Sequence, residues 1–297
     1  MLHSVLREWG LTMSMTKTKL LVVGSDEVED LRPLEVDGSE VECVSEFKYL
    51  GSLVESRGGI VKEVGERIAK ASRAFGALRK AVFRDNNLSH KTKRLVYKAA
   101  VLGVLLYGSE TWTTTRAVSK KLEVFHNRCL KGILGITAMQ QWSDHLSSVE
   151  IARQFGMEES LEDLITARRL RWLGHVARMK EERVQKKLLF GWLPQRRPAH
   201  GTKMRWRDRV RKDLKKFGVN ERCWYSEAQE RGRWRQQCKE GLVDATERRL
   251  REHDNHRRMA ALSVPTLQPF TCNRCRRSFR RGQDIARHRC VTTRPRS

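Results

Sequence analysis

The sequence predicts a mainly α-helical protein with a short β-rich segment at the N-terminus and a small cysteine–histidine module at the C-terminus. Three patterns support this fold class. Polar and apolar residues alternate within residues 35–54, and apolar residues recur every three or four positions from residue 61 onward. Two cysteines and a histidine near the C-terminus stand at the spacing of metal ligands.

The first segment, residues 1–58, is predicted to contain short strands. Its alternating pattern is interrupted at Asp37-Gly38, a pair typical of hairpin turns, so we expect a β-hairpin within residues 35–54. Residues 11–15 also alternate, and residues 20–23 form a short apolar run. This pattern predicts a strand at each of these two places.

The second segment, residues 59–190, is predicted to be a helical domain. Its first helix follows Gly58-Gly59 and carries its basic residues away from the apolar stripe. Ser89 is placed to cap the next helix, and further helices are predicted over residues 122–134 and 161–178. The apolar stripe of the first helix consists of Val61, Val64, Ile68, Ala71, Phe75, Leu78 and Val82.

The third segment, residues 191–262, is predicted to be basic and helical. It opens with a loop, residues 191–201, that contains two prolines and two glycines. A short basic helix is expected over residues 205–218 and a longer helix over residues 221–260. The fourth segment, residues 263–297, is the cysteine–histidine module.

The charge of the chain is strongly unbalanced. It has 60 Lys and Arg against 35 Asp and Glu, a net charge of +25. The first 50 residues contain 5 basic and 10 acidic residues, so the whole positive excess lies after them. A surface of this charge attracts polyanions because binding releases their counterions. RNA, DNA or both are therefore the expected partners, ahead of an acidic membrane surface.

The cysteines and the hydropathy pattern bear on the compartment. Seven cysteines without regular spacing do not predict a disulfide framework, so a reducing compartment, nuclear or cytoplasmic, is expected. The first ten residues lack the apolar stretch of a signal peptide, which predicts that the protein is not secreted. The longest apolar run, residues 99–107, is much shorter than the ~20 residues of a membrane-spanning helix, so no membrane partner is expected.

The fourth segment has the ligand spacing of a small zinc finger. Two residues separate Cys272 from Cys275, and His288 follows after twelve more. About twenty residues bury too little apolar surface to fold without a metal, so zinc is the expected cofactor. The segment resembles the two-cysteine, two-histidine finger family, which has a second histidine where this sequence has none.

The fourth zinc ligand is the point at which the spacing departs from that family. Cys290 is the nearest donor, but residues two apart on a regular helix point on the order of 200° away from each other. The helix would have to unwind at His288 for both side chains to reach one ion. Cys290 is the expected ligand, and the alternatives are His253, His256 and water.

Arginines interleaved with tryptophans predict contacts with nucleic acid in two places, residues 169–172 and 205–212. Guanidinium groups there can bind phosphates, and an indole can stack on a base. Trp172 and Trp206 are nevertheless expected in the core, because tryptophan is mostly buried. The arginines of the finger are expected to contact phosphates rather than bases. The predicted contacts are Arg169, Arg171, Arg205, Arg207, Arg209, Arg211, Lys212, Arg276, Arg277, Arg280 and Arg281.

An ordered set of motifs runs through residues 8–290. It begins with GLTMSMTKTKLLVVG and EFKYLGSLVESRGG, and continues with KTKRLVYKAAVLGVLLYGSETW, LEVFHNRCLKGILGI, RLRWLGHVARM and GTKMRWRDRVRKDLKKFG. This set resembles the C-terminal part of non-LTR (LINE-type) retrotransposon reverse transcriptases. The first motif is similar to the segment after the active-site hairpin, the second to the primer-grip hairpin, and the others to the thumb and post-thumb region. A terminal Cys/His finger also occurs in that family.

The resemblance implies a fold and a function. It implies that residues 1–58 are the end of a polymerase palm, residues 59–190 a helical thumb, and residues 191–262 a basic post-thumb region. The family copies RNA into DNA with two metal ions held by aspartates, and the metals stabilise the attacking and leaving oxygens. No Asp-Asp pair occurs in this sequence, so this chain alone is expected to be catalytically inactive. Phe47 and Tyr49 match the primer-grip hairpin, although they are equally expected to form its core.

The expected function is therefore zinc and nucleic-acid binding by a C-terminal fragment of such an enzyme. One alternative is a host zinc-finger regulator derived from a retroelement, although a single finger reads only ~3 base pairs. A second is an enzyme that becomes active when a full-length reverse transcriptase supplies the palm. A third is a decayed copy with no selected role.

Overall fold

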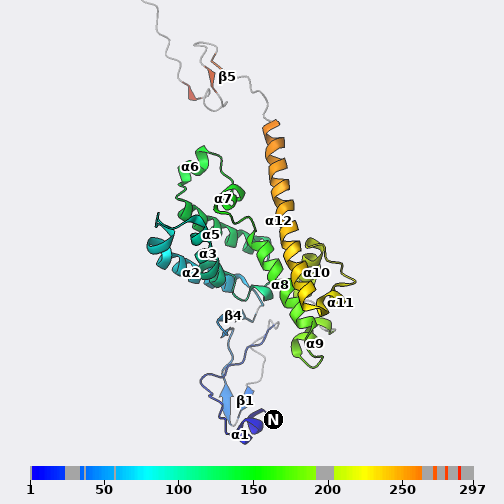
Figure 1. Cartoon of the computed structure of the whole chain (residues 1–297). Coiled ribbons are helices and arrows are strands. Elements are labelled where there is room, and N and C mark those ends of the chain that lie inside the picture. Colours follow the sequence, from blue (N-terminus) through cyan, green and yellow to red (C-terminus); the bar gives the residue numbers. More distant parts are fainter. Residues whose placement is uncertain are drawn as a thin grey trace, which may run out of the picture. The chain divides into compact units, whose positions relative to one another are not determined.

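The computed structural model describes residues 2–23, 34–36, 38–56, 58–191, 204–262, 270–272, 278–279 and 287–288, which belong to two compact units, residues 1–247 and 248–297. Figure 1 shows that helices make up most of the described chain and that short strands lie near the N-terminus. The predicted fold class is thus confirmed in its helical character and in its N-terminal strands.

The first hairpin of the N-terminal part forms where the sequence predicts it. β1 (Leu34–Val36) pairs antiparallel with β2 (Ser39–Val41), so that Val36 lies opposite Ser39. Gly38 in the turn has a φ of 72°, a left-handed conformation that glycine adopts without steric cost.

The prediction of two strands before this hairpin is wrong. Residues 11–15 form no strand, and in the run 20–23 only Leu20 makes an isolated parallel bridge to Cys43. A strand needs a continuous ladder of hydrogen bonds to a neighbour, and neither segment has one among the described residues. The helix before these segments is α1 (Leu2–Glu8).

The second hairpin packs on the first long helix of the helical part. β3 (Glu46–Tyr49) pairs with β4 (Ser52–Glu55), and the two turn residues, Leu50 and Gly51, have φ values of 47° and 82°. Positive φ at both positions is the geometry of a tight type I′ turn. Buried side chains of the helix hold the hairpin: Glu63 Oε2 accepts from the amide of Leu53 (2.7 Å), and Arg67 donates to the carbonyl of Gly51 (2.6 Å).

The first hydrophobic core forms between α2 (Val61–Leu78) and α5 (Arg116–Leu134). The predicted stripe of α2 faces this core with Val64 and Ala71 fully buried, whereas Val61 is exposed. The other elements of the core are the π-helical turns η1 (Arg79–Phe83) and η2 (Tyr97–Leu102), and helices α3 (His90–Val96), α4 (Gly103–Leu105) and α7 (Ser148–Phe155).

Side-chain caps fix the ends of several helices. Ser89 caps α3 as predicted, since its hydroxyl accepts from the amide of Thr92 (3.1 Å). Two helices that the periodicity did not predict, α6 (Ala138–Ser143) and α7, begin with capping boxes, Thr137 with Gln140 and Ser147 with Glu150. These two short helices depend on local capping signals more than on a long apolar stripe.

A buried polar pair lies inside the first core. The Tyr97 hydroxyl is 2.9 Å from His126 Nδ1, and both residues are at most 2% exposed. Burial lowers the pKa of His126 from 6.5 to about 4, because the imidazolium would lose its hydration there. His126 is therefore a neutral core histidine at physiological pH.

Helix α8 (Leu161–Ala177) belongs to two hydrophobic cores. Leu161 and Ile165 complete the first core, whereas Leu170 and Leu173 lie in a second core with the later helices. Figure 1 shows α8 between these groups of helices. The second core also includes residues from α9 (Val184–Phe190), α10 (Trp206–Lys216), α11 (Trp224–Gln229) and α12 (Arg231–Leu262).

Two glycines allow close packing in the second core. A Cβ atom at Gly174 would lie 2.2 Å from Nε1 of Trp234, and one at Gly241 would lie 2.6 Å from Cβ of Phe217. The single helix predicted over residues 221–260 is interrupted at Glu230, whose ψ of 105° is extended, and so becomes α11 and α12.

The described part of the second unit includes a two-stranded hairpin. β5 (Phe270–Thr271) pairs with β6 (Ser278–Phe279), so that Phe270 lies opposite Phe279. The first unit also contains a 3-10 turn, η3 (Ser109–Thr111). None of the described helices is both long and apolar enough to cross a membrane.

We predict that acid destabilises the protein through His126. The folded pKa is depressed, so the unfolded state binds the extra proton between pH 6.5 and about 4, and stability falls as the pH drops through that window. The loss should approach about 3 kcal/mol at its lower end. Urea unfolding of wild type and His126→Gln at several pH values measures it. The variant should lose this part of the pH dependence, whereas His90→Gln, at an exposed position, should keep it.

Candidate nucleic-acid interface

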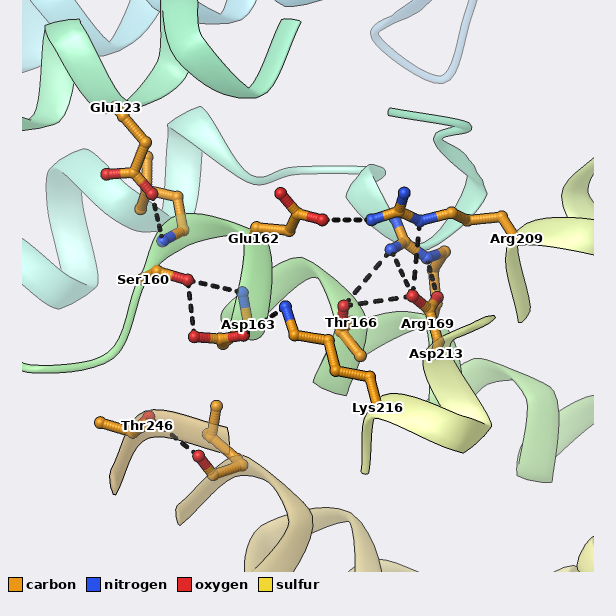
Figure 2. Close-up of polar contacts among 12 residues, drawn as sticks. Glu123, Ser160, Glu162, Asp163, Thr166, Arg169, Arg209, Asp213, Lys216 and Thr246 are labelled. Carbon is orange, nitrogen blue, oxygen red and sulfur yellow. Dashed lines mark hydrogen bonds and ion pairs between the residues drawn. The ribbon is translucent and has the colours of Figure 1, made fainter. Parts of the chain in front are cut away.

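A buried ion pair joins α8 to α10. Arg169 donates from Nε to Asp213 Oδ2 (2.5 Å) and from Nη2 to Oδ1 (3.1 Å), and both residues are at most 1% exposed. Nη1 of Arg169 donates to the carbonyl of Trp112 (3.1 Å), and the Thr166 hydroxyl donates to Asp213 Oδ1 (3.3 Å). Figure 2 shows this bidentate arrangement. The guanidinium is thus neutralised and hydrogen-bonded inside the protein, as a buried charge must be.

Two further ion pairs of α8 and α10 surround the buried one (Figure 2). Lys216 Nζ lies 2.6 Å from Asp163 Oδ1, and Arg209 pairs with Glu162 and lies 3.4 Å from Asp213. Ser160 caps α8 through the amide of Asp163, and this first turn is further held by Glu123 of α5, which accepts from the amide of Leu161. The two helices are therefore held in one relative position by matched charges.

The structure corrects the prediction that Arg169 contacts nucleic acid. Its side chain has no exposed surface, and its charge is already neutralised by Asp213, so it is a structural group. Arg209 was also predicted as a contact, but its side chain is 14% exposed and is engaged by Glu162. The burial of Arg169 could have been predicted from the helical period. This residue lies four positions after Ile165 and four before Leu173, on the apolar side of α8.

The other predicted basic residues of α8 and α10 lie on the surface. Arg207 and Arg211 are exposed, and the described part of the chain offers no carboxylate within ion-pair distance of either. Lys215, which the sequence analysis did not single out, continues the same stripe one turn further. We call Arg207, Arg211 and Lys215 the α10 stripe. The remaining predicted contacts that are exposed are Arg171, Arg205 and Lys212.

The two tryptophans that alternate with these arginines pack inward, as expected. Trp172 and Trp206 are half-buried against the second core. The Trp206 indole donates to the carbonyl of Glu110 (2.8 Å), which ties the start of α10 to η3. Neither indole is a free stacking platform on the α10 stripe.

The predicted primer-grip residues lie on β3. Phe47 is half-buried opposite Val54, whereas Tyr49 is 63% exposed opposite Ser52. Only Phe47 could serve as hairpin core, and Tyr49 presents its ring to the surface. Because α2 holds the hairpin, the backbone at Tyr49 has a fixed position.

The predicted zinc ligands are only partly described. Cys272 directly follows β5, and His288 is half-buried, while Cys275 and Cys290 lie outside the described residues. The predicted contacts Arg276, Arg277, Arg280 and Arg281 also lie outside them. In the described ranges, no three His, Cys, Asp or Glu side chains gather as a metal site. The pairing of β5 with β6 places Thr271 opposite Ser278, and the sequence between these two residues contains both Cys272 and Cys275.

Comparison with known proteins gives one informative similarity. The chain matches no protein-family model and no solved structure. It is 30% identical over 178 residues to a protein of Caenorhabditis elegans that is described as transposon-derived. The match covers 59% of this chain and 62% of that protein, so the chain spans less than two thirds of its relative. This similarity supports a transposon-related origin for the chain.

We predict that Asp213→Asn destabilises the protein strongly. It would leave the buried guanidinium of Arg169 without a counter-charge, which costs about 3–5 kcal/mol. Glu162→Gln is the matched control, because it removes the partly exposed partner of Arg209, and it should cost less than about 1 kcal/mol. Urea denaturation at neutral pH measures both changes. Equal small effects would show that the buried pair does not hold α10 on α8.

Proposed function

We propose that this chain is a nucleic-acid-binding segment of a non-LTR retrotransposon reverse transcriptase, from the region after the catalytic palm. The α10 stripe carries the proposal: three exposed cations on one helix face with no ion-pair partner in the described part of the chain. An unpaired basic stripe binds the phosphate backbone without regard to sequence. The order of the motifs and the transposon-derived relative support the proposed origin.

Polymerisation by this chain alone is not part of the proposal. The family's reaction needs clustered aspartates to hold two metal ions, and the sequence contains no Asp-Asp pair. The residues proposed here can position a nucleic acid, and the chemistry would need a palm supplied in the same assembly. Tyr49 is the exposed aromatic residue of the grip-like hairpin, and its ring could stack on a base of a primer strand.

We also propose that the second unit contains a zinc-binding finger. Two thiolates, an imidazole and one further donor form a set that zinc prefers. The β5–β6 hairpin supports the proposal, because a zinc finger of this class holds its two cysteines on such a hairpin. Zinc would supply folding energy to this short segment, and it would have no role in chemistry.

We expect the α10 stripe to contribute strongly to nucleic-acid affinity. Arg207→Gln/Arg211→Gln/Lys215→Gln should weaken binding of a 20-nucleotide single-stranded RNA. It should also reduce the slope of log affinity against log salt by about 2, at ~0.7 per phosphate contact. Fluorescence anisotropy over a salt series measures both quantities. The control is Lys120→Gln/Lys121→Gln/Arg128→Gln, which removes three exposed charges from α5. Equal losses in the two triple variants, or no binding by wild type at low salt, would contradict the proposal.

We expect the full chain to bind one equivalent of zinc. Cys272→Ala/Cys275→Ala should abolish it, and Cys43→Ala/Cys223→Ala, which removes two exposed cysteines outside the finger, should retain it. Acidification should release the metal, because protons compete for the thiolates and the imidazole. Metal analysis after gel filtration measures the content. Zinc retained by the first variant, or absent from wild type, would rule out the finger.

A further inference from the structure

A pocket of about 360 Å³ lies between α8 and the start of α12 in the first unit. Its volume falls within the roughly 300–1,000 Å³ range of small-ligand sites. Two of its residues, Arg171 and His175, are the exposed residues of α8. We call this the arginine pocket, and its lining residues are Arg171, His175, Arg178, Arg231, Trp234 and Arg235.

The pocket gathers four guanidinium groups. No carboxylate lines it, and none of the four arginines forms an ion pair within the described ranges. This contrasts with Arg169 and Arg209, whose charges are matched by carboxylates. Burial, and then repulsion from Arg231, lowers the pKa of Arg178. Like charges held this closely repel one another, so an anion in the pocket would relieve an unfavourable arrangement.

Backbone hydrogen bonds hold two of these arginines in place. Arg178 donates from Nη1 to the carbonyl of Ala228, and Arg171 donates from Nε to the carbonyl of Ala167 (3.2 Å). A guanidinium has five N–H donors, so each retains others for a ligand. Because these contacts already hold the two side chains, less conformational entropy would be lost when a ligand orders them.

The indole of Trp234 gives the pocket a rigid wall. It is 1% exposed, packs over Gly174, and donates to the carbonyl of Leu170 (2.8 Å). Its donor is thus already used, and the ring shapes the wall without binding the ligand. Because α12 begins at Arg231, the positive end of its helix dipole adds to the field at the pocket.

We propose that the arginine pocket binds a phosphate group. A phosphate has several acceptor oxygens around one centre and suits the planar, bidentate donors of arginine. Four guanidinium groups carry more positive charge than a ligand with a single carboxylate could neutralise. The volume of the pocket leaves room for a sugar next to the phosphate. The source is a phosphate of a nucleic-acid backbone or a free phosphorylated molecule. For the first source the inference rests on the nucleic-acid binding proposed above.

The test compares two double variants of the full chain. Arg171→Gln/Arg235→Gln removes two charges from the pocket and leaves the contact of Arg178 with α11 intact. Arg222→Gln/Arg233→Gln removes two exposed charges outside the pocket and the α10 stripe. Each protein is titrated with the 20-nucleotide RNA by anisotropy and, separately, with inorganic pyrophosphate by calorimetry.

The expected result is a tenfold or greater loss of RNA affinity in the pocket variant, with a change of less than twofold in the control. If wild type binds no RNA but binds pyrophosphate saturably, and only the pocket variant loses it, the pocket takes a free phosphorylated molecule. That result would contradict the proposed function and would support a phosphate site in the pocket. If both double variants match wild type in both titrations, or lose affinity equally, or if wild type binds neither ligand, the inference is overturned.

Discussion

The first unit is organised around a buried positive charge, the guanidinium of Arg169. A charge without access to water needs a counter-charge and hydrogen bonds within the protein, and Asp213 and the carbonyl of Trp112 supply them. These contacts hold α10 and the end of η3 against α8, the helix that contributes to both hydrophobic cores. The rotation of α10 about its own axis is fixed in the same way, because Asp213 must face inward.

The exposed charge of α10 follows from that constraint. Arg211 and Lys215 each stand two residues from Asp213, which places them about 160° around the helix from it. Once Asp213 is buried, these side chains face solvent, where no carboxylate neutralises them in the described part of the chain. The arginine pocket shows the same principle, since no carboxylate lines it and its arginines form no ion pair within the described part of the chain. Arginines that are neutralised by carboxylates stabilise the fold, and those that are not neutralised are available to a polyanion.

Much of the helical architecture was predictable from local patterns. The periodicity located α2, α5, α8 and α10, Ser89 was recognised as a cap, and Asp37-Gly38 marked the first hairpin. Helices α6 and α7 were missed because their signals are capping boxes. The strands expected over residues 11–15 and 20–23 were wrong because alternation does not guarantee a pairing partner. The candidate interface was only partly predictable, because Arg169 and Arg171 stand in the same short sequence motif, and yet Arg169 is buried and Arg171 is exposed.

The helical class, the large positive charge, the order of the motifs and the spacing of Cys272, Cys275 and His288 can be read directly from the amino-acid sequence. These properties depend on composition and on neighbours within a few residues. Which arginines are neutralised and which gather around a pocket depends instead on how the helices pack. Asp213 is 44 residues from Arg169, and Trp234 is 64 residues from the α8 carbonyl that it contacts. No local pattern specifies partners so distant, because packing of the cores brings them together.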